Sequence, residues 1–461
     1  GKFEVKYKSL LGLQTVAKNW DVTDREGYQQ ITTAAELNAG LTIAPGNDPT
    51  SPLYINDVNT NWQKEAFETG VVNNQSLTLS GGAESMAYNM NVDYFKNTSY
   101  VNSPQDYERI STNLNLSGKK GKFKYGSKIG YTQSDKENFN SYVGESAIAA
   151  LLTAIPTMPV YDENRLGGYG GTDNLTQRAI SLNVIGFNNL IDNSGQRNRF
   201  IGNIWGELEI VKGLKYKIDA SFDRLDWQDR KFNPPSDLGW YYITTNDEAE
   251  LNVVTGNESR TFLNNLLTYE KTIGNHKFDA LAGWIQERSD YYRHWSNGKG
   301  YTPGEISHLE YADATSSGEY ENTKTGISYL SRINYSYDDR YFITGNFRQD
   351  KTSLFSQENN TGNFYSFSGA WKISNETFLH LPEWVSNIKL RGGYGVLGNN
   401  TIGTYAYSPT INAFAGYNFN NELANGTTVV SAIDPNVHWE ETKSTNVALE
   451  LGFLNNSLQF S

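Results

Sequence analysis

Two short runs near the middle of the chain decide the fold: Tyr329-Leu330-Ser331-Arg332-Ile333-Asn334-Tyr335-Ser336-Tyr337 and Tyr341-Phe342-Ile343-Thr344-Gly345-Asn346-Phe347-Arg348. In both runs a largely aromatic and aliphatic set of side chains alternates with a polar set. A period of two is the period of a β-strand, because successive side chains point to opposite faces of a sheet. The turn Asp338-Asp339-Arg340 joins the runs, and a third alternating run, residues 365–373, follows a loop.

The alternation predicts two faces of opposite character. An apolar face toward lipid, a polar lumen and aromatic residues near the strand ends are typical of a transmembrane β-barrel. A soluble β-sandwich also alternates, so periodicity alone leaves both architectures open. We expect Tyr329, Ile333, Tyr335, Ile343, Phe347, Phe367 and Trp371 to face outward, and Arg332, Asn334, Asn346, Arg348, Ser368 and Lys372 to face inward.

The composition fits a barrel and argues against several other classes of protein. Aromatic residues make up 13% of the 461 residues although hydrophobic residues make up only 38%, and glycine is abundant. Low hydrophobicity is compatible with a membrane barrel, since half of each strand faces a polar lumen. A net charge of −12 argues against nucleic-acid binding. The absence of cysteine excludes disulfides and thiol chemistry.

The remaining chain predicts roughly fifteen strands in all, whose connections alternate between short and long. This asymmetry favours an outer-membrane barrel over a sandwich or a propeller. A helix is expected over residues 25–39, with Asp24 as its N-cap. The further strands are expected at residues 3–12, 73–80, 86–95, 109–116, 123–131, 200–210, 214–222, 261–270, 276–286, 388–396, 445–453 and from 458 onward, and the main long loops at residues 133–198, 223–260, 287–325 and 397–444.

Several motifs in order resemble the SusC-like (SusC/RagA) TonB-linked outer-membrane proteins. They are Trp62-Gln63-Lys64-Glu65-Ala66-Phe67-Glu68-Thr69-Gly70, Ser328 to Tyr337 with Phe347-Arg348-Gln349-Asp350-Lys351, Ala370-Trp371-Lys372-Ile373-Ser374-Asn375-Glu376, Leu390-Arg391-Gly392-Gly393-Tyr394-Gly395 and Trp439-Glu440-Glu441-Thr442-Lys443. The resemblance spans essentially the whole chain.

The resemblance implies that residues 1–461 are an incomplete barrel domain of about 22 antiparallel strands, without the plug domain that precedes it in the family. Energised import of a bulky nutrient through the outer membrane of a Gram-negative, Bacteroidetes-like cell is then expected, with a glycan as the first candidate and a peptide as the second. The implied partners are a SusD-like surface lipoprotein, the TonB–ExbB–ExbD system acting through the absent N-terminal region, and outer-membrane lipid. A passive porin or a structural barrel without energy coupling is the alternative.

No residue pattern predicts an enzyme, a metal site or a cofactor. The five histidines have no metal-ligand spacing, and no nucleophile elbow, phosphate loop or dinucleotide fingerprint is present. Two of the expected extracellular loops are rich in aromatic residues, which offer sugar rings a stacking surface. Packing between loops is the structural alternative for the same residues. The candidate ligand-binding residues are Trp227, Trp240, Tyr241, Tyr242, Tyr291, Tyr292 and Trp295.

Overall fold

The computed structural model describes residues 2–103, 105–140, 147–239, 245–301, 307–431 and 433–461. Within these residues, fifteen strands form one antiparallel sheet in which neighbours in space are neighbours along the chain. The fold class predicted from the alternation is therefore confirmed. The strands of this sheet are β1 (Glu4–Gln14), β2 (Gly70–Ala83), β3 (Met86–Thr98), β4 (Asp106–Lys120), β5 (Phe123–Glu137), β6 (Asp192–Val211), β7 (Leu214–Asn233), β10 (Glu250–Ile273), β11 (His276–Lys299), β12 (Ala314–Tyr337), β13 (Tyr341–Thr352), β14 (Thr361–Lys372), β15 (Val385–Asn399), β18 (Glu440–Phe453) and β19 (Leu458–Phe460).

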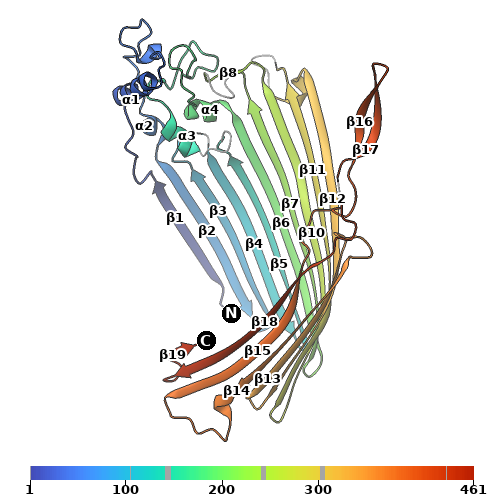
Figure 1. Cartoon of the computed structure of the whole chain (residues 1–461). Helices are drawn as coiled ribbons and strands as arrows, with labels where there is room; N and C mark the ends of the chain where they lie inside the picture. The colour runs from blue at the N-terminus through green and yellow to red at the C-terminus, as the bar shows by residue number, and fades with distance from the viewer. Residues whose placement is uncertain (1, 104, 141–146, 240–244, 302–306, 432) are drawn as a thin grey trace.

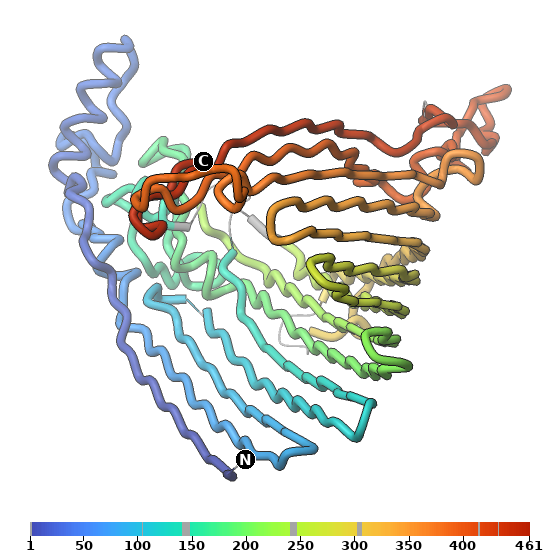
Figure 2. The backbone as a smooth tube through the Cα atoms, turned by 90° about the horizontal axis from the view of Figure 1, so that it is seen from below, coloured from blue at the N-terminus to red at the C-terminus, as the bar shows by residue number. Residues whose placement is uncertain are grey.

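The sheet curves into an open trough that is C-shaped in cross-section (Figure 2). Its connections differ at the two ends, which we call the turn end and the loop end. Most connections at the turn end are tight, as between Val211 and Leu214 and between Ile273 and His276. Those at the loop end are longer and carry the helices (Figure 1). The predicted alternation of short and long connections is thus present.

The convex face of the sheet carries an apolar band. Ile333 and Ile343 are 61% and 57% exposed, and Phe367, two strands from Ile333 in the same cross-strand row, is 61% exposed. A soluble sandwich would bury such side chains between its sheets, whereas a membrane barrel turns them toward lipid. The cross-strand register places all seven residues predicted to face outward on this one face, as predicted.

The concave face is polar and hydrogen-bonded across strands. Asn334 donates to Asp279 Oδ1 at 2.7 Å and accepts a hydrogen bond from Thr344 Oγ1 at 2.9 Å. Arg332 lies 3.7 Å from the same Asp279. The residues predicted to face inward share this face, because directly opposed residues in an antiparallel pair point the same way.

At the turn end, Glu376 is a nearly buried carboxylate that joins three side chains. It accepts hydrogen bonds from Tyr341 Oη at 2.6 Å, Trp371 Nε1 at 2.7 Å and Arg340 Nη1 at 2.9 Å. The rings of Tyr341 and Trp371 are stacked, and the Arg340 guanidinium lies over Tyr337 and Tyr341. These hydrogen bonds, led by that of Tyr341, hold the pKa of Glu376 below its ordinary value.

Short helices at the loop end form a small packed core of their own. The predicted helix is present as α1 (Arg25–Asn38), and the Asp24 carboxylate accepts from Gly27 N at 2.9 Å. Trp62, Met158 and Ile185 are buried together, and Trp62 Nε1 donates to the carbonyl of Ile155. The elements not predicted from sequence are α2 (Trp62–Ala66), α3 (Ala147–Thr153), α4 (Val184–Leu190), the single turns η1 (Pro45–Asn47), η2 (Leu309–Tyr311) and η3 (Ile373–Asn375), and the strand pairs β8 (Ser236–Asp237) with β9 (Thr245–Asn246) and β16 (Ile411–Phe419) with β17 (Glu422–Val429).

No helix in the described ranges is long and apolar enough to cross a membrane.

Candidate functional site

The four candidate aromatic residues within the described ranges lie on strands, which corrects the prediction that they lie in loops. Trp227 is in β7, and Tyr291, Tyr292 and Trp295 are in β11. The ladder between β7 and β10 runs without interruption from Leu214 to Asn233. Apolar alternation stops near Phe222, whereas backbone pairing continues for eleven further residues. Both faces are largely polar in that upper part, so the hydropathy pattern no longer marks the strand.

The predicted long loops are correspondingly shorter. The connection predicted over residues 223–260 occupies 234–249, and the one predicted over 287–325 occupies 300–313. The loops predicted over 133–198 and 397–444 occupy 138–191 and 400–439. Trp240, Tyr241 and Tyr242 lie outside the described residues.

Neighbouring candidates in β11 point to opposite faces. Trp227, Tyr291 and Trp295 share the concave face, because they alternate in phase with the inward-facing polar residues of the same strands. Tyr292 points to the convex face, where its hydroxyl donates to Glu319 Oε2 at 3.2 Å. The structure therefore brings three of the four described candidates onto one surface and separates the fourth from them.

Two of the concave candidates, Trp227 and Tyr291, belong to an aromatic run that extends over the neighbouring strands β7, β10, β11 and β12. The ring centroids of Trp227 and Tyr291 are 5.6 Å apart, and those of Tyr291 and Tyr320 are 6.1 Å apart. Tyr320, which is 52% exposed, was not among the candidates predicted from sequence. Its segment of β12, Ala314 to Gly326, is polar and carries no apolar alternation that would single it out.

Two glycines make room for the tryptophan rings. Gly256 is the cross-strand partner of Trp227, and Gly318 is the partner of Trp295. A Cβ atom at Gly256 would lie 2.3 Å from Trp227 Cζ2, and one at Gly318 would lie 2.7 Å from the same atom of Trp295. Each indole therefore lies flat over the neighbouring strand, which leaves a smooth apolar surface between polar side chains.

Paired charges surround this aromatic run. The guanidinium of Arg197 donates to both carboxylate oxygens of Asp229 at 2.7 and 2.9 Å. Arg197 makes both contacts through Nη2, whereas Arg199 forms a bidentate pair with Asp223, Nε donating to Oδ1 at 2.9 Å and Nη2 to Oδ2 at 2.6 Å. Bidentate pairs hold planar donors in fixed positions. The concave surface above the apolar band thus combines flat rings with ordered polar groups, a combination that suits ligands with both apolar faces and many hydroxyls.

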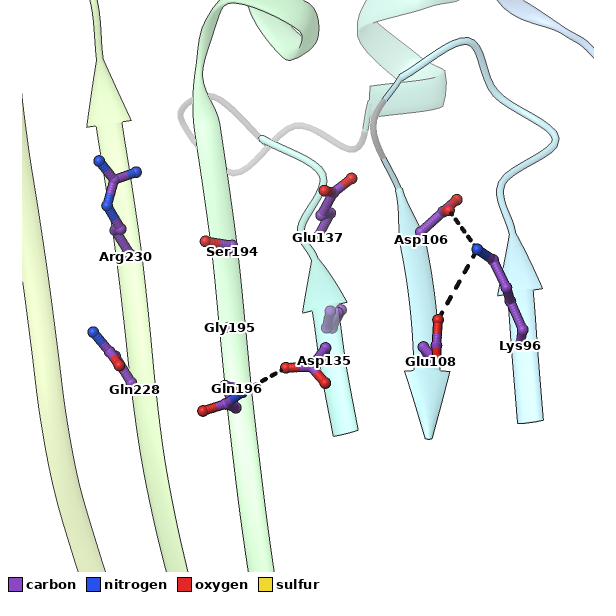
Figure 3. A pocket seen from close by; sticks show the side chains of 11 residues that line it. Lys96, Asp106, Glu108, Asp135, Glu137, Ser194, Gly195, Gln196, Gln228 and Arg230 are labelled. Carbon is purple, nitrogen blue, oxygen red and sulfur yellow. Dashed lines mark hydrogen bonds and ion pairs between the residues drawn. The ribbon is translucent and has the colours of Figure 1, made fainter. Parts of the chain in front are cut away.

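A hollow of about 490 Å³ lies on the convex face just above the apolar band. Figure 3 shows its side chains on neighbouring strands from β3 to β7. Gln196 and Gln228 are a cross-strand pair next to the concave pair Arg197 and Trp227, so they point to the opposite, convex face. Lys96 Nζ lies 3.7 Å from Asp106 and 4.0 Å from Glu108, and Gln196 donates to Asp135 at 2.8 Å. Because it faces outward, this hollow is separate from the aromatic run.

No group of three or more acidic or histidine side chains in the described part of the chain is arranged to hold a metal ion. The described residues show charge pairs and stacking surfaces at this site, which can bind and orient a ligand.

Comparison with known proteins supports the resemblance seen in the motifs. No family model matches the chain. The chain is 26% identical over 428 residues to the TonB-dependent receptor SusC of Bacteroides thetaiotaomicron. The matched region covers 88% of this chain and 42% of that protein. It is 25% identical over 420 residues to the TonB-dependent receptor P3 of Formosa agariphila, a match that covers 87% of this chain and 40% of that protein. The chain thus spans about two fifths of the length of these relatives.

The fold is also that of a solved transporter. The structure of the RagAB peptide importer in the open-open state superposes with a TM-score of 0.80 at 20% identity, covering all of this chain and 53% of that one. The chain is therefore confirmed as similar to SusC-like TonB-linked outer-membrane proteins, with a transmembrane barrel fold and an outer-membrane location. Its relatives are named as receptors and not as enzymes.

Proposed function

We propose that this chain is part of the barrel of a TonB-dependent importer that carries a bulky nutrient, with a glycan as the favoured cargo, across the outer membrane. The observation that carries the proposal is the aromatic run on the concave face above the apolar band, where Trp227, Tyr291 and Tyr320 line the entrance side of a polar trough. The loop end is then extracellular and the turn end periplasmic, as in barrels with short periplasmic turns.

The cargo assignment rests on surface chemistry. Sugar rings present C–H faces that stack on aromatic rings, and their hydroxyls bond to fixed polar groups such as the Arg197–Asp229 pair. A peptide that docks as an added strand needs a free sheet edge. Strands β7, β10 and β11 are each paired on both sides along the aromatic run, so their backbones offer no such edge. This favours a glycan, although the RagAB structure is named a peptide importer.

A SusD-like lipoprotein and the TonB–ExbB–ExbD system are the proposed partners of the whole protein. The packed helical core at the loop end, with Trp62 and Ile185 at its centre, would give a surface lipoprotein an ordered platform. Energy coupling requires a segment that contacts TonB and a plug, which we assign to the full-length protein.

Uptake by cells tests the proposal directly. A strain lacking the full-length protein should lose growth on the cargo glycan, and deletion of TonB should abolish uptake even when the importer is present. Uptake that persists without TonB would establish the passive porin instead. Replacement of Tyr291 should reduce glycan binding with assembly intact. Binding of peptides with no glycan binding would overturn the cargo assignment and leave TonB-dependent import standing.

A further inference from the structure

One cross-strand row of the concave face carries an arginine in the middle of the aromatic run. The register places Arg197, Trp227, Gly256, Arg293 and Tyr320 side by side on β6, β7, β10, β11 and β12. Neighbouring strands are about 4.8 Å apart, so Arg293 lies within about 10 Å of the backbone of each ring-bearing residue in this row. Gly256, the residue between Trp227 and Arg293 in this row, contributes no side chain.

Arg293 differs from the other arginines around it in having no carboxylate partner. Arg197, Arg199 and Arg260 are each paired with Asp229, Asp223 and Glu258, respectively. In the described residues Arg293 makes no ion pair, and its side chain is exposed. A guanidinium beside flat rings is suited to bidentate recognition of a carboxylate or sulfate group.

Two further cations on the same face are also unpaired within the described ranges. Lys231 lies two residues beyond Asp229 on β7, and Lys324 lies opposite Ser289 on β12. Glu287, lower on β11, is an unpaired carboxylate of this part of the face. This local excess of positive charge stands out in a chain whose net charge is −12. A surface of one sign of charge attracts ligands of the other sign.

We infer that the cargo is an anionic glycan, whose carboxylate or sulfate groups are held by Arg293 while its sugar rings stack on Trp227, Tyr291 and Tyr320. The inference rests on the proposed import function and adds the charge class of the substrate. An acidic peptide would share the charge, but it would have no ring faces in regular succession for the aromatic run.

The test uses the full-length importer with its lipoprotein partner and isothermal titration. The probes are oligomers of galacturonate, of glucuronate and of mannuronate with guluronate, each compared with its methyl ester, together with sulfated and neutral oligosaccharides and acidic peptides. Methyl esterification removes the charge and keeps the sugar ring. At least one acidic sugar probe should bind about tenfold or more tightly than its neutral counterpart, with an affinity that falls as salt is added.

Two matched substitutions on β11 locate the effect. Arg293→Gln should weaken binding of the acidic probe about tenfold, as expected for loss of a hydrogen bond to a charged group. Arg288→Gln should leave binding unchanged, because Arg288 points to the convex face and pairs there with Asp290.

Any one of four results would overturn the inference. They are equal affinity for acid and ester, preference for neutral sugars or peptides, no binding by any acidic sugar probe, and unaltered affinity of the Arg293→Gln variant. TonB-dependent uptake of a neutral glycan in the cell assay described above would keep the proposed import function. Loss of TonB dependence would refute that function separately.

Discussion

The indole of Trp227 lies directly over Gly256, its partner on the adjacent strand, where even one added methyl carbon would come within 2.3 Å of the ring. The same Cβ would also lie 2.6 Å from the carbonyl oxygen of Tyr292. The Trp227 ring therefore occupies the space that a side chain at position 256 would fill, so the position of the ring depends on the glycine in β10.

Gly256→Ala should displace the Trp227 ring and lower both stability and ligand affinity. Overpacking at such a contact costs about 1–3 kcal/mol. Denaturant unfolding of the full-length protein measures stability, and a ligand titration followed by tryptophan fluorescence measures affinity. Gly345→Ala is the control, because its Cβ would approach no atom more closely than 3.7 Å. Equal behaviour of the two variants would show that the indole does not need this glycine.

Tyr291→Ala and Tyr292→Ala should separate ligand binding from strand packing. The two residues are adjacent on β11 but face opposite sides of the sheet. Loss of Tyr291 removes the ring between Trp227 and Tyr320, and a stacking contact is worth about 0.5–1.5 kcal/mol beyond its buried area. We expect weaker glycan binding for Tyr291→Ala only, by titration calorimetry. A larger effect from Tyr292→Ala would move the ligand surface to the convex face.

Charge introduced on the two faces should have opposite outcomes. Ile333→Arg places a cation in the apolar band, at an expected cost of about 2–4 kcal/mol if it lies near the bilayer midplane. Asn334→Arg places the same group on the polar face, beside Asp279, and should be tolerated. The stabilities of the two full-length variants are compared by their unfolding in lipid vesicles. A stable Ile333→Arg variant would contradict the assignment of the convex face to lipid.

Glu376 should make the turn end sensitive to acid. Its folded pKa is lowered, so its contribution to stability is present above its unfolded pKa and is lost as the pH falls through the folded value. Melting temperatures measured from neutral to acidic pH should fall less steeply for Glu376→Gln than for the natural protein, and the variant should be less stable at neutral pH. Glu383→Gln, an exposed carboxylate in the same connection, should follow the natural protein. Parallel curves for all three would show that Glu376 makes no such contribution.

Periodicity predicted the strands well wherever lipid defines one face. Ile333, Ile343 and Phe367 alternate with polar residues, and the structure places them on the predicted face. The strand ends were predicted less well, because the apolar residues of the convex face of β7 end at Phe222 and are followed there by Arg224 and Asp226, which are hydrogen-bonded to one another. Tyr320 was missed for the same reason. The distinction between Tyr291 and Tyr292 also required the register.

The missed elements at the loop end depend on tertiary packing or on turn chemistry. The helix of Trp62 is five residues long, too short to show a helical period, and is stabilised by burial against Ile155 and Ile185. The β16–β17 hairpin turns at Asn420 and Asn421, which have φ of 51° and 66°. Two asparagines with positive φ between alternating residues are typical of a two-residue hairpin turn, so this signal was present in the sequence.

The length of the strands bears on how the proposed importer changes its specificity during evolution. Strands β10 and β11 have 24 residues each, whereas about 9–11 are enough to cross a bilayer. The wall that faces the proposed cargo is thus paired backbone, in which an inserted residue would turn every following side chain to the wrong face. New specificities are then reached by exchanging single side chains at fixed positions of this wall, while changes of length are confined to the connections beyond it.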